Sequence, residues 1–187
     1  MKIVVVGASG VLGRAMLAHL RSHEVIGTTR SPDKLPVLAA LGARGVICDV
    51  YAPGALRAAM IAAAPDVVVN VLTDLAGGIG PGNARIRSVG GPIVVDAARA
   101  AGARRLLVES IAFPTTPASD AAVAALEDGA CTSGLEAVVL RFGRFWGPGT
   151  WSEAGPAEPP TVHVDVAGRR AVELIDAVPG VYTISDP

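Results

Sequence analysis

The chain begins with a hydrophobic strand pattern that runs directly into a glycine-rich turn. Residues 2–6 read Lys-Ile-Val-Val-Val, and Gly7-Ala-Ser-Gly10-Val-Leu-Gly13 follows them. After the turn, apolar residues recur at helical spacing, so the segment predicts a strand, a tight turn and a helix. In such a unit the first glycine permits the turn, the second permits close approach of a pyrophosphate, and the third permits close helix packing.

This turn is a candidate phosphate-binding site. The amides at the start of a helix have no intrahelical acceptor and carry a partial positive charge that attracts phosphates. A plain structural corner between strand and helix is the alternative, but the flanking strand and helix patterns favour a dinucleotide site. The residues that we expect to contact the dinucleotide here are Gly7, Ser9, Gly10, Val11, Leu12 and Gly13.

The composition is that of a globular protein with few charges. The chain has 187 residues, of which 51% are hydrophobic and 18% charged, and its formal net charge is −1. No basic surface of the kind that binds nucleic acid is indicated, and no apolar stretch is long enough to cross a membrane. The first strand begins at Lys2, which leaves no room for a signal peptide, so a cytoplasmic location is expected. Cys48 and Cys131 are isolated, which indicates neither a metal site nor a disulfide framework.

Strand-like and helix-like segments alternate along the whole chain. Strands are predicted at residues 2–7, 24–28, 45–48, 66–72, 105–109, 136–141 and 181–184. Helices are predicted at residues 11–22, 33–41, 53–64, 83–101, 120–132 and 165–177. This alternation predicts a doubly wound (Rossmann) α/β fold, with a mostly parallel sheet and helices on both faces, as a single domain over residues 1–187. Residues 143–161, rich in Gly and Pro, are expected to form an irregular loop on the substrate side.

The end of the second predicted strand indicates which dinucleotide is bound. An acidic residue there binds the ribose 2′-hydroxyl of NAD, whereas a basic residue accommodates the 2′-phosphate of NADP. This chain has Thr29 and Arg30 at that place, and its first carboxylate is Asp33, beyond the strand. A guanidinium can form a charge-assisted contact with a phosphate, although a solvated surface arginine is the alternative. The sequence therefore predicts NADP(H) rather than NAD(H) as the cofactor.

The ends of three further strands supply the remaining candidate contacts. Asp49 and Val50 follow the third strand, where the carboxylate can accept a hydrogen bond from adenine and the valine can pack on the ring. A role in a surface turn is the alternative for Asp49. Leu72 and Thr73 end the fourth strand and Ser110 ends the fifth, facing the crevice where ligands bind in such sheets. Thr73 and Ser110 are expected near the nicotinamide, or else as caps of the following helices.

Together these segments resemble the extended and atypical short-chain dehydrogenase/reductase superfamily, specifically the NAD(P)-dependent epimerase/dehydratase group. The resemblance covers nearly the whole chain and rests on GASGVLG at 7–13, CDV at 48–50, RRLLVES at 104–110, GLEAVVLRFGRFWGPGT at 134–150 and VHVDVAGRRAVELI at 162–175. It implies an NADP(H)-binding oxidoreductase that acts on a small carbonyl, hydroxyl or sugar-derived substrate. The segment ending at Trp146 would lie beside the nicotinamide, and Asp165 would cap a late helix. The resemblance also implies a homodimer built on the alanine-rich helices at 83–101 and 120–132.

The chain departs from this family where the chemistry is carried out. Members typically use a Tyr and a Lys four residues apart on one helix, where the lysine lowers the tyrosine pKa so that the phenol can exchange a proton. Ser119 and Val123 stand at about these positions, and no tyrosine of the chain has a lysine at that spacing. The catalytic residues are therefore unknown. Asp74, Glu109 and Asp120 are candidate general acids or bases that the sequence does not distinguish.

Two further features bear on activity. The stretch between Gly149 and Val162 is short, so the substrate-binding region is reduced. A histidine at position 163 and the tryptophans at 146 and 151 line this region, either as pocket residues or as structural cover. Weak catalysis is one expectation. A non-catalytic NADP(H) sensor or scaffold is the alternative, and a relic that binds nothing is a third.

Overall fold

A parallel sheet of seven strands forms the centre of the protein. The computed structural model describes residues 1–52, 54–74, 81–156 and 158–186. The strands follow the order β3-β2-β1-β4-β5-β6-β9, and every neighbouring pair is parallel. Their bounds are β1 (Lys2–Val6), β2 (Glu24–Thr29), β3 (Ala43–Ile47), β4 (Val67–Asn70), β5 (Arg105–Ile111), β6 (Glu136–Phe142) and β9 (Gly180–Ile184). The strand order reverses direction between β1 and β4, which is where such folds bind dinucleotides.

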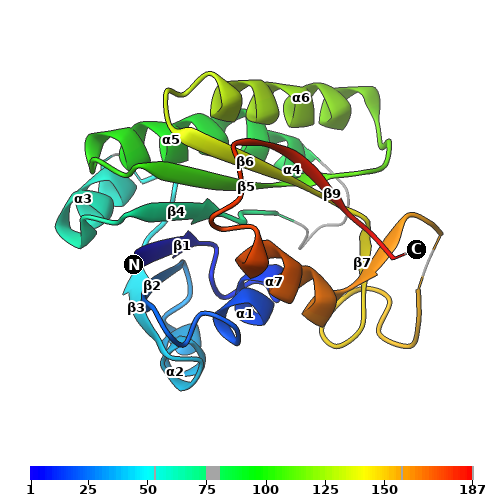
Figure 1. Cartoon of the computed structure of the whole chain (residues 1–187), viewed down its shortest axis with the longest axis horizontal. Coiled ribbons are helices and arrows are strands. Elements are labelled where there is room, and N and C mark those ends of the chain that lie inside the picture. The colour runs from blue at the N-terminus through cyan, green and yellow to red at the C-terminus, as the bar shows by residue number, and fades with distance from the viewer. Residues whose placement is uncertain (53, 75–80, 157, 187) are drawn as a thin grey trace.

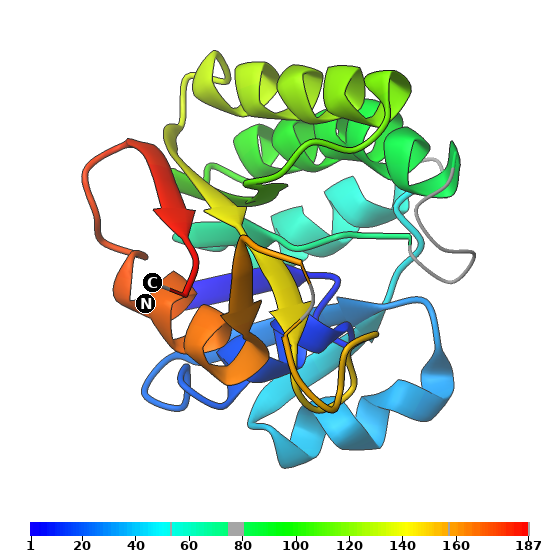
Figure 2. The ribbon, with the colours of Figure 1, turned by 90° about the vertical axis from the view of Figure 1, so that its right-hand side faces the viewer.

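Helices cover both faces of this sheet. They are α1 (Val11–Leu17), α2 (Leu35–Ala40, after a 3₁₀ turn at Pro32–Lys34), α3 (Ala55–Ala63), α4 (Pro81–Arg85), a π-helical segment (Ile86–Gly90), α5 (Gly91–Ala100), α6 (Pro117–Cys131) and α7 (Val164–Glu173). In both views α5 and α6 lie together on one side of the sheet, and α1 and α7 lie on the other (Figures 1 and 2). The predicted doubly wound α/β fold is confirmed.

The alternation of side chains along each strand divides the hydrophobic core in two. In β1, Ile3 and Val5 belong to the core beneath α1 and α7, whereas Val4 and Val6 belong to the core beneath α3 and α5. All four side chains are buried. A strand that is covered on both faces must be apolar at every position, which is why these strands read as continuous hydrophobic runs.

The structure differs from the sequence-based expectation in two places. The helix predicted at 83–101 is interrupted by the π-helical segment at Ile86–Gly90. The stretch predicted as an irregular loop contains two short parallel strands, β7 (Arg144–Trp146) and β8 (Thr161–His163), which pair only with each other. Strands of three residues are too short to show a period of two in the sequence.

The described residues offer neither a membrane-spanning helix nor a cluster of metal ligands. No helix in the described ranges is both long and apolar enough to span a bilayer. The same ranges hold no cluster of three or more His, Cys, Asp or Glu side chains that could bind a metal ion.

Candidate cofactor-binding site

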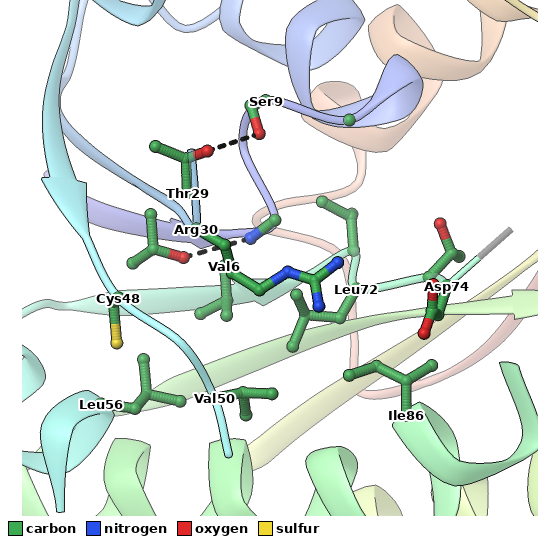
Figure 3. Close-up of a pocket in the computed structure, with 15 residues that line it drawn as sticks. Val6, Ser9, Thr29, Arg30, Cys48, Val50, Leu56, Leu72, Asp74 and Ile86 are labelled. Atoms are coloured by element: carbon green, nitrogen blue, oxygen red, sulfur yellow. Dashed lines mark hydrogen bonds between the residues drawn. The ribbon is translucent and has the colours of Figure 1, made fainter. Parts of the chain in front are cut away.

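A cavity of about 220 Å³ opens at the carboxyl ends of the central strands. Figure 3 shows the residues that line it. Its wall comes from six segments: the end of β1 with the glycine turn after it, the end of β2, the residues after β3, the start of α3, the residues after β4, and the π-helical segment. Two of these strands, β1 and β4, flank the point where the strand order reverses.

Two glycines of the turn have no room for a side chain. Gly7 has a φ of +88°, and a Cβ there would lie 3.0 Å from the carbonyl oxygen of Val71. A Cβ at Gly13 would lie 2.7 Å from the carbonyl oxygens of both Gly7 and Ala8. The first glycine therefore permits the turn and the third lets α1 pack on it, as expected from the sequence.

Hydrogen bonds from β2 hold the turn in shape. The amide of Gly7 donates to Oγ1 of Thr28 at 3.2 Å, and the amide of Ala8 donates to the carbonyl oxygen of Thr28 at 3.1 Å. The hydroxyls of Ser9 and Thr29 are 2.9 Å apart (Figure 3). Hydrogen bonds to β2 therefore fix the conformation of the turn.

The start of α1 offers the donors that a diphosphate needs. The residue before the helix is Gly10, which is exposed and has no side chain to cap the helix. The amides of Val11, Leu12 and Gly13 lie in the first turn, where N–H groups have no intrahelical acceptor. Together with the glycine cradle, these donors fit the pyrophosphate of a dinucleotide.

The end of the cavity near β2 is where an adenosine would lie. The Arg30 side chain is exposed and extends from the end of β2 over the cavity (Figure 3). Val50, Leu56 and Cys48 form a buried, mostly apolar wall at the same end. Burial raises the pKa of the Cys48 thiol, with a smaller contribution from the charge of Asp49.

The structure brings some predicted contacts into the cavity wall and leaves others outside it. The predicted residues that line the cavity are Gly7, Ser9, Gly10, Thr29, Arg30, Val50, Leu72 and Thr73. Those that do not line it are Val11, Leu12, Gly13, Asp49 and Ser110. For the first three of these the candidate contact is the backbone amide.

The other two have partners of their own. One carboxylate oxygen of Asp49 accepts the amide of Tyr51 at 2.9 Å, which is the geometry of a turn. Ser110 is fully buried, and its hydroxyl donates to Glu127 on α6. Because side chains alternate along β5, Ser110 shares the face of Val108, which belongs to the core beneath α3 and α5. The Ser110 side chain is therefore engaged by α6 on this face of the sheet.

No sequence motif predicted that several other residues lie at or near the site. Ile86 lines the cavity from the π-helical segment, which no motif predicts. The guanidinium of Arg85 lies 4.2 Å from the centre of the Tyr51 ring, next to the cavity residue Val50. The Tyr51 hydroxyl is buried without a hydrogen-bond partner in the described part of the chain, and burial raises its pKa.

The helix that would carry the Tyr/Lys pair of the resembling family has neither residue. In α6, Ser119 is buried and Val123 is half-buried. Val123 lines a second hollow together with Phe113 and Asp120. The two other candidate acids lie elsewhere: Asp74 lines the cofactor cavity, and Glu109 is buried near the end of β5.

The substrate-side segment is held by structural contacts. The indole nitrogen of Trp146 donates to Asp186 at 2.9 Å, and its ring packs edge-on against His163 with centroids 4.6 Å apart. His163, rather than the expected Asp165, caps α7, since its Nδ1 accepts the amide of Asp165 at 3.3 Å. Trp151 is 77% exposed. These contacts of His163 are therefore those of a structural residue, which caps a helix and packs against Trp146.

Comparison with known proteins bears on the cofactor. Residues 7–145 match the family described as NAD(P)H-binding. A 3-diazoavenalumate denitrifying reductase from a Streptomyces species is 35% identical over an alignment of 180 residues, which covers 80% of this chain and 58% of that protein. The chain thus spans somewhat more than half the length of this relative.

Solved structures share the fold at low sequence identity. A candidate NAD-dependent epimerase/dehydratase from Bacillus halodurans superposes with a TM-score of 0.81 at 21% identity, over 100% of this chain and 94% of that one. The enzyme WbmH from Bordetella bronchiseptica, in complex with NAD⁺, gives 0.79 at 21% identity, over 99% of this chain and 75% of that one. The fold is thus that of epimerases and dehydratases, and from the match over residues 7–145 the chain belongs to the NAD(P)H-binding family.

Proposed function

We propose that this protein is an NADP(H)-dependent reductase that acts on a small electrophilic compound. The observation that carries this proposal is that one cavity contains both the glycine turn and Arg30. The turn and the first amides of α1 would hold the diphosphate, and Val50 would pack on the adenine. When bound, the cofactor supplies the hydride, and the protein's task is to hold and orient the two reactants.

The preference for NADP(H) rests on the charges around the adenosine end of the cavity. Arg30 is the one cationic side chain among the described residues that line the cavity, and Asp74, from the loop after β4, is the one anionic side chain. Lys34 is paired with Asp33 at 3.3 Å and does not line the cavity. A 2′-phosphate beside Arg30 would gain a charge-assisted contact that a 2′-hydroxyl cannot provide.

A parallel titration with NADPH and NADH tests this preference. Loss of a hydrogen bond to a charged group costs about 1.5–3 kcal/mol, so Arg30→Ala should weaken NADPH binding roughly 10- to 100-fold and leave NADH binding nearly unchanged. Arg44→Ala, an exposed arginine on β3 outside the cavity wall, is the matched control and should leave both affinities unchanged. Tighter binding of NADH than of NADPH to the wild-type protein would contradict the proposal.

The missing Tyr/Lys pair bears on the class of substrate. Reduction of a small carbonyl or sugar-derived compound needs a hydride at carbon and a proton at oxygen, and no tyrosine or lysine of α6 can supply that proton. Loss of a general acid typically costs about 10²–10⁴-fold in rate. Carbonyl reduction by this chain would therefore be slow unless another group gives the proton.

The Streptomyces relative points to a second substrate class, an aromatic diazo compound. Replacement of a diazonium group by hydride breaks the C–N bond, forms a C–H bond and releases N₂, so it consumes no proton. A site without a Tyr/Lys pair is sufficient for this reaction. We expect NADPH consumption with an aryl diazonium salt to exceed that with simple aldehydes and ketones, with one N₂ released per NADPH. Turnover of carbonyl compounds alone would exclude this class.

A non-catalytic sensor or scaffold is the remaining candidate, favoured by the same absence of the pair. It predicts tight cofactor binding with no NADPH consumption across both substrate classes. The titration and the consumption assay together separate the reductase from the sensor.

A further inference from the structure

Two buried ionisable side chains lie beside the cofactor cavity and have no role in the site described above. Glu109, near the carboxyl end of β5, is 8% exposed. Arg87, in the π-helical segment, is 4% exposed. Carboxylates and guanidinium groups are rarely so deeply buried, because removal of a charge from water is costly.

The register of the sheet places Glu109 level with a residue of the cavity wall, Val71. Asn70 of β4 pairs with Val108 of β5, so the next residues, Val71 and Glu109, lie at the same level on neighbouring strands. Val71 continues the ladder, since its amide donates to the carbonyl oxygen of Val6, and it lines the cavity. Residues at one level of neighbouring parallel strands face the same side of the sheet.

Arg87 approaches the same place from the helical segment. Ile86, the residue before it, lines the cavity. The charges of Arg87 and Glu109 act on each other. Burial lowers the pKa of Arg87, and the charge of Glu109 acts in the opposite direction. The charge of Arg87 in turn acts to lower the pKa of Glu109. The second buried carboxylate nearby, Glu127 on α6, is bound by Arg141 and Ser110. Among the described residues, Arg87 is therefore the charged group that acts on Glu109.

Burial outweighs this attraction at the carboxyl group. It raises the pKa of Glu109 to about 7, although Arg87 acts in the opposite direction. Glu109 therefore exchanges its proton near neutral pH, where an added positive charge nearby would be enough to ionise it.

The cofactor is a source of such a charge. A dinucleotide with its diphosphate on the turn after β1 and its adenosine at β2 and β3 extends its other nucleotide toward β4 and β5. The oxidised nicotinamide ring is cationic and the reduced ring is neutral. The oxidised ring would thus favour the carboxylate form of Glu109, and the reduced ring would favour the carboxylic acid.

We propose that Glu109, buried at the level of the cavity residue Val71, is a proton-storing group whose protonation follows the redox state of the bound cofactor. This inference rests on the proposed cofactor site. In the reduction of a carbonyl compound, the same group would supply the proton that the substrate oxygen needs. As the hydride forms the new C–H bond and the C=O double bond becomes single, the oxygen would take up one proton, and the Glu109 carboxyl would give up one. Glu109 is left ionised until it regains a proton from solvent.

Calorimetric titration with NADP⁺ and NADPH between pH 6 and pH 8.5 tests the proposal without any turnover. Both forms carry the same phosphates, so phosphate titration cancels in the ratio of their dissociation constants. As the pH rises through 7, the ratio should shift in favour of NADP⁺ by about fivefold or more, the usual size of a coupling between two sites. Comparison of phosphate and Tris buffers should show proton release when NADP⁺ binds near pH 7.

Three variants make this test specific. Glu109→Gln should remove both the shift and the proton release. Glu109→Asp should keep the shift with a changed midpoint, and Arg87→Gln should move the midpoint to higher pH because the lowering charge is gone. Glu127→Gln is the matched control and should keep the wild-type response. Glu127 is also a buried carboxylate, but it lies on α6 and contacts Ser110 on the opposite face of β5.

The outcomes separate the two proposals. A wild-type ratio that does not change with pH, or a shift that persists in Glu109→Gln, would overturn the role of Glu109 alone. If NADP(H) does not bind but NAD(H) does, the same titration with NAD⁺ and NADH decides the role of Glu109, and only the cofactor preference fails. Absence of binding for both cofactor pairs would overturn the proposed function and this inference with it.

Discussion

Because Gly13 has no side chain, α1 can pack closely against the turn that forms the candidate phosphate site. The Cα of Gly13 faces the carbonyl oxygens of Gly7 and Ala8, and an added Cβ would lie 2.7 Å from both. Neither backbone carbonyl can move without opening the turn that would hold the diphosphate. The close packing of α1 and the shape of the candidate site therefore depend on the same residue.

We expect Gly13→Ala to lower the free energy of unfolding by about 1–3 kcal/mol, the usual cost of overpacking, and to weaken NADPH and NADH alike. Urea denaturation and calorimetric titration would measure both effects. Gly129→Ala is the matched control, since Gly129 lies within α6 with nothing within 4 Å of an added Cβ. That substitution should stabilise the protein by about 0.5–1 kcal/mol. Unchanged affinities in Gly13→Ala would contradict the role given to the turn.

Glu109 links the site to the pH dependence of stability. Burial raises its pKa from 4.5 to about 7 in the folded protein. The folded protein therefore binds more protons than the unfolded chain between these two values. The contribution of Glu109 to stability is fully present below pH 4.5 and is lost as the pH rises through 7.

Glu109→Gln remains neutral at every pH, so relative to wild type it should gain about 3 kcal/mol of unfolding free energy between pH 4.5 and pH 8. Urea denaturation of both proteins across this range measures the difference. Glu24→Gln, on an exposed residue, should show a far smaller trend. A difference between Glu109→Gln and wild type that stays constant with pH would contradict the buried, protonated state.

At the scale of elements, Arg105 connects three parts of the fold. From β5 it donates to the carbonyl oxygens of Ile175 and Ala177, which follow α7, at 2.7 and 2.6 Å, and it pairs with Glu136 at the start of β6. Its side chain is 7% exposed, whereas that of Arg104, which pairs with the same carboxylate, is 53% exposed. Arg104 and Arg105 therefore form a solvated ion pair and a buried one with the same carboxylate.

Arg105→Ala should lower the free energy of unfolding by about 2–3 kcal/mol or more, because buried carbonyl groups lose a charged donor. Arg104→Ala should cost about 0–1 kcal/mol, as exposed ion pairs do. Chemical denaturation of the two variants side by side measures the contrast. Equal losses would mean that the stabilisation comes from the ion pair with Glu136 and not from the hydrogen bonds to the residues after α7.

At the scale of the whole molecule, the alanine-rich helices have different surroundings. Ala97 and Ala98 of α5 are buried in the core of this chain. Ala121, Ala124 and Ala125 of α6 are exposed. The expected homodimer would therefore bury this face of α6, where small side chains permit close approach of a second helix.

We expect light scattering to give twice the chain mass of 18.9 kDa and Ala124→Arg to return the mass to that of a monomer. Arg57→Ala, on the exposed surface of α3, should leave the mass of the dimer unchanged. A monomeric mass of the wild-type protein at all concentrations would exclude this assembly.

The sequence alone determined the alternating α/β order, the glycine turn and the position of Arg30. These features depend on neighbours in the chain: a strand buried on both faces must be apolar throughout, and a turn with positive φ favours glycine. Only the tertiary structure decided that Ser110 faces α6, that Ile86 lines the cavity, and that the charge of Arg87 acts on Glu109, 22 positions further along the chain. Such contacts join elements far apart in sequence, and the burial that raises the pKa of Glu109 exists only once the sheet and its helices have packed together.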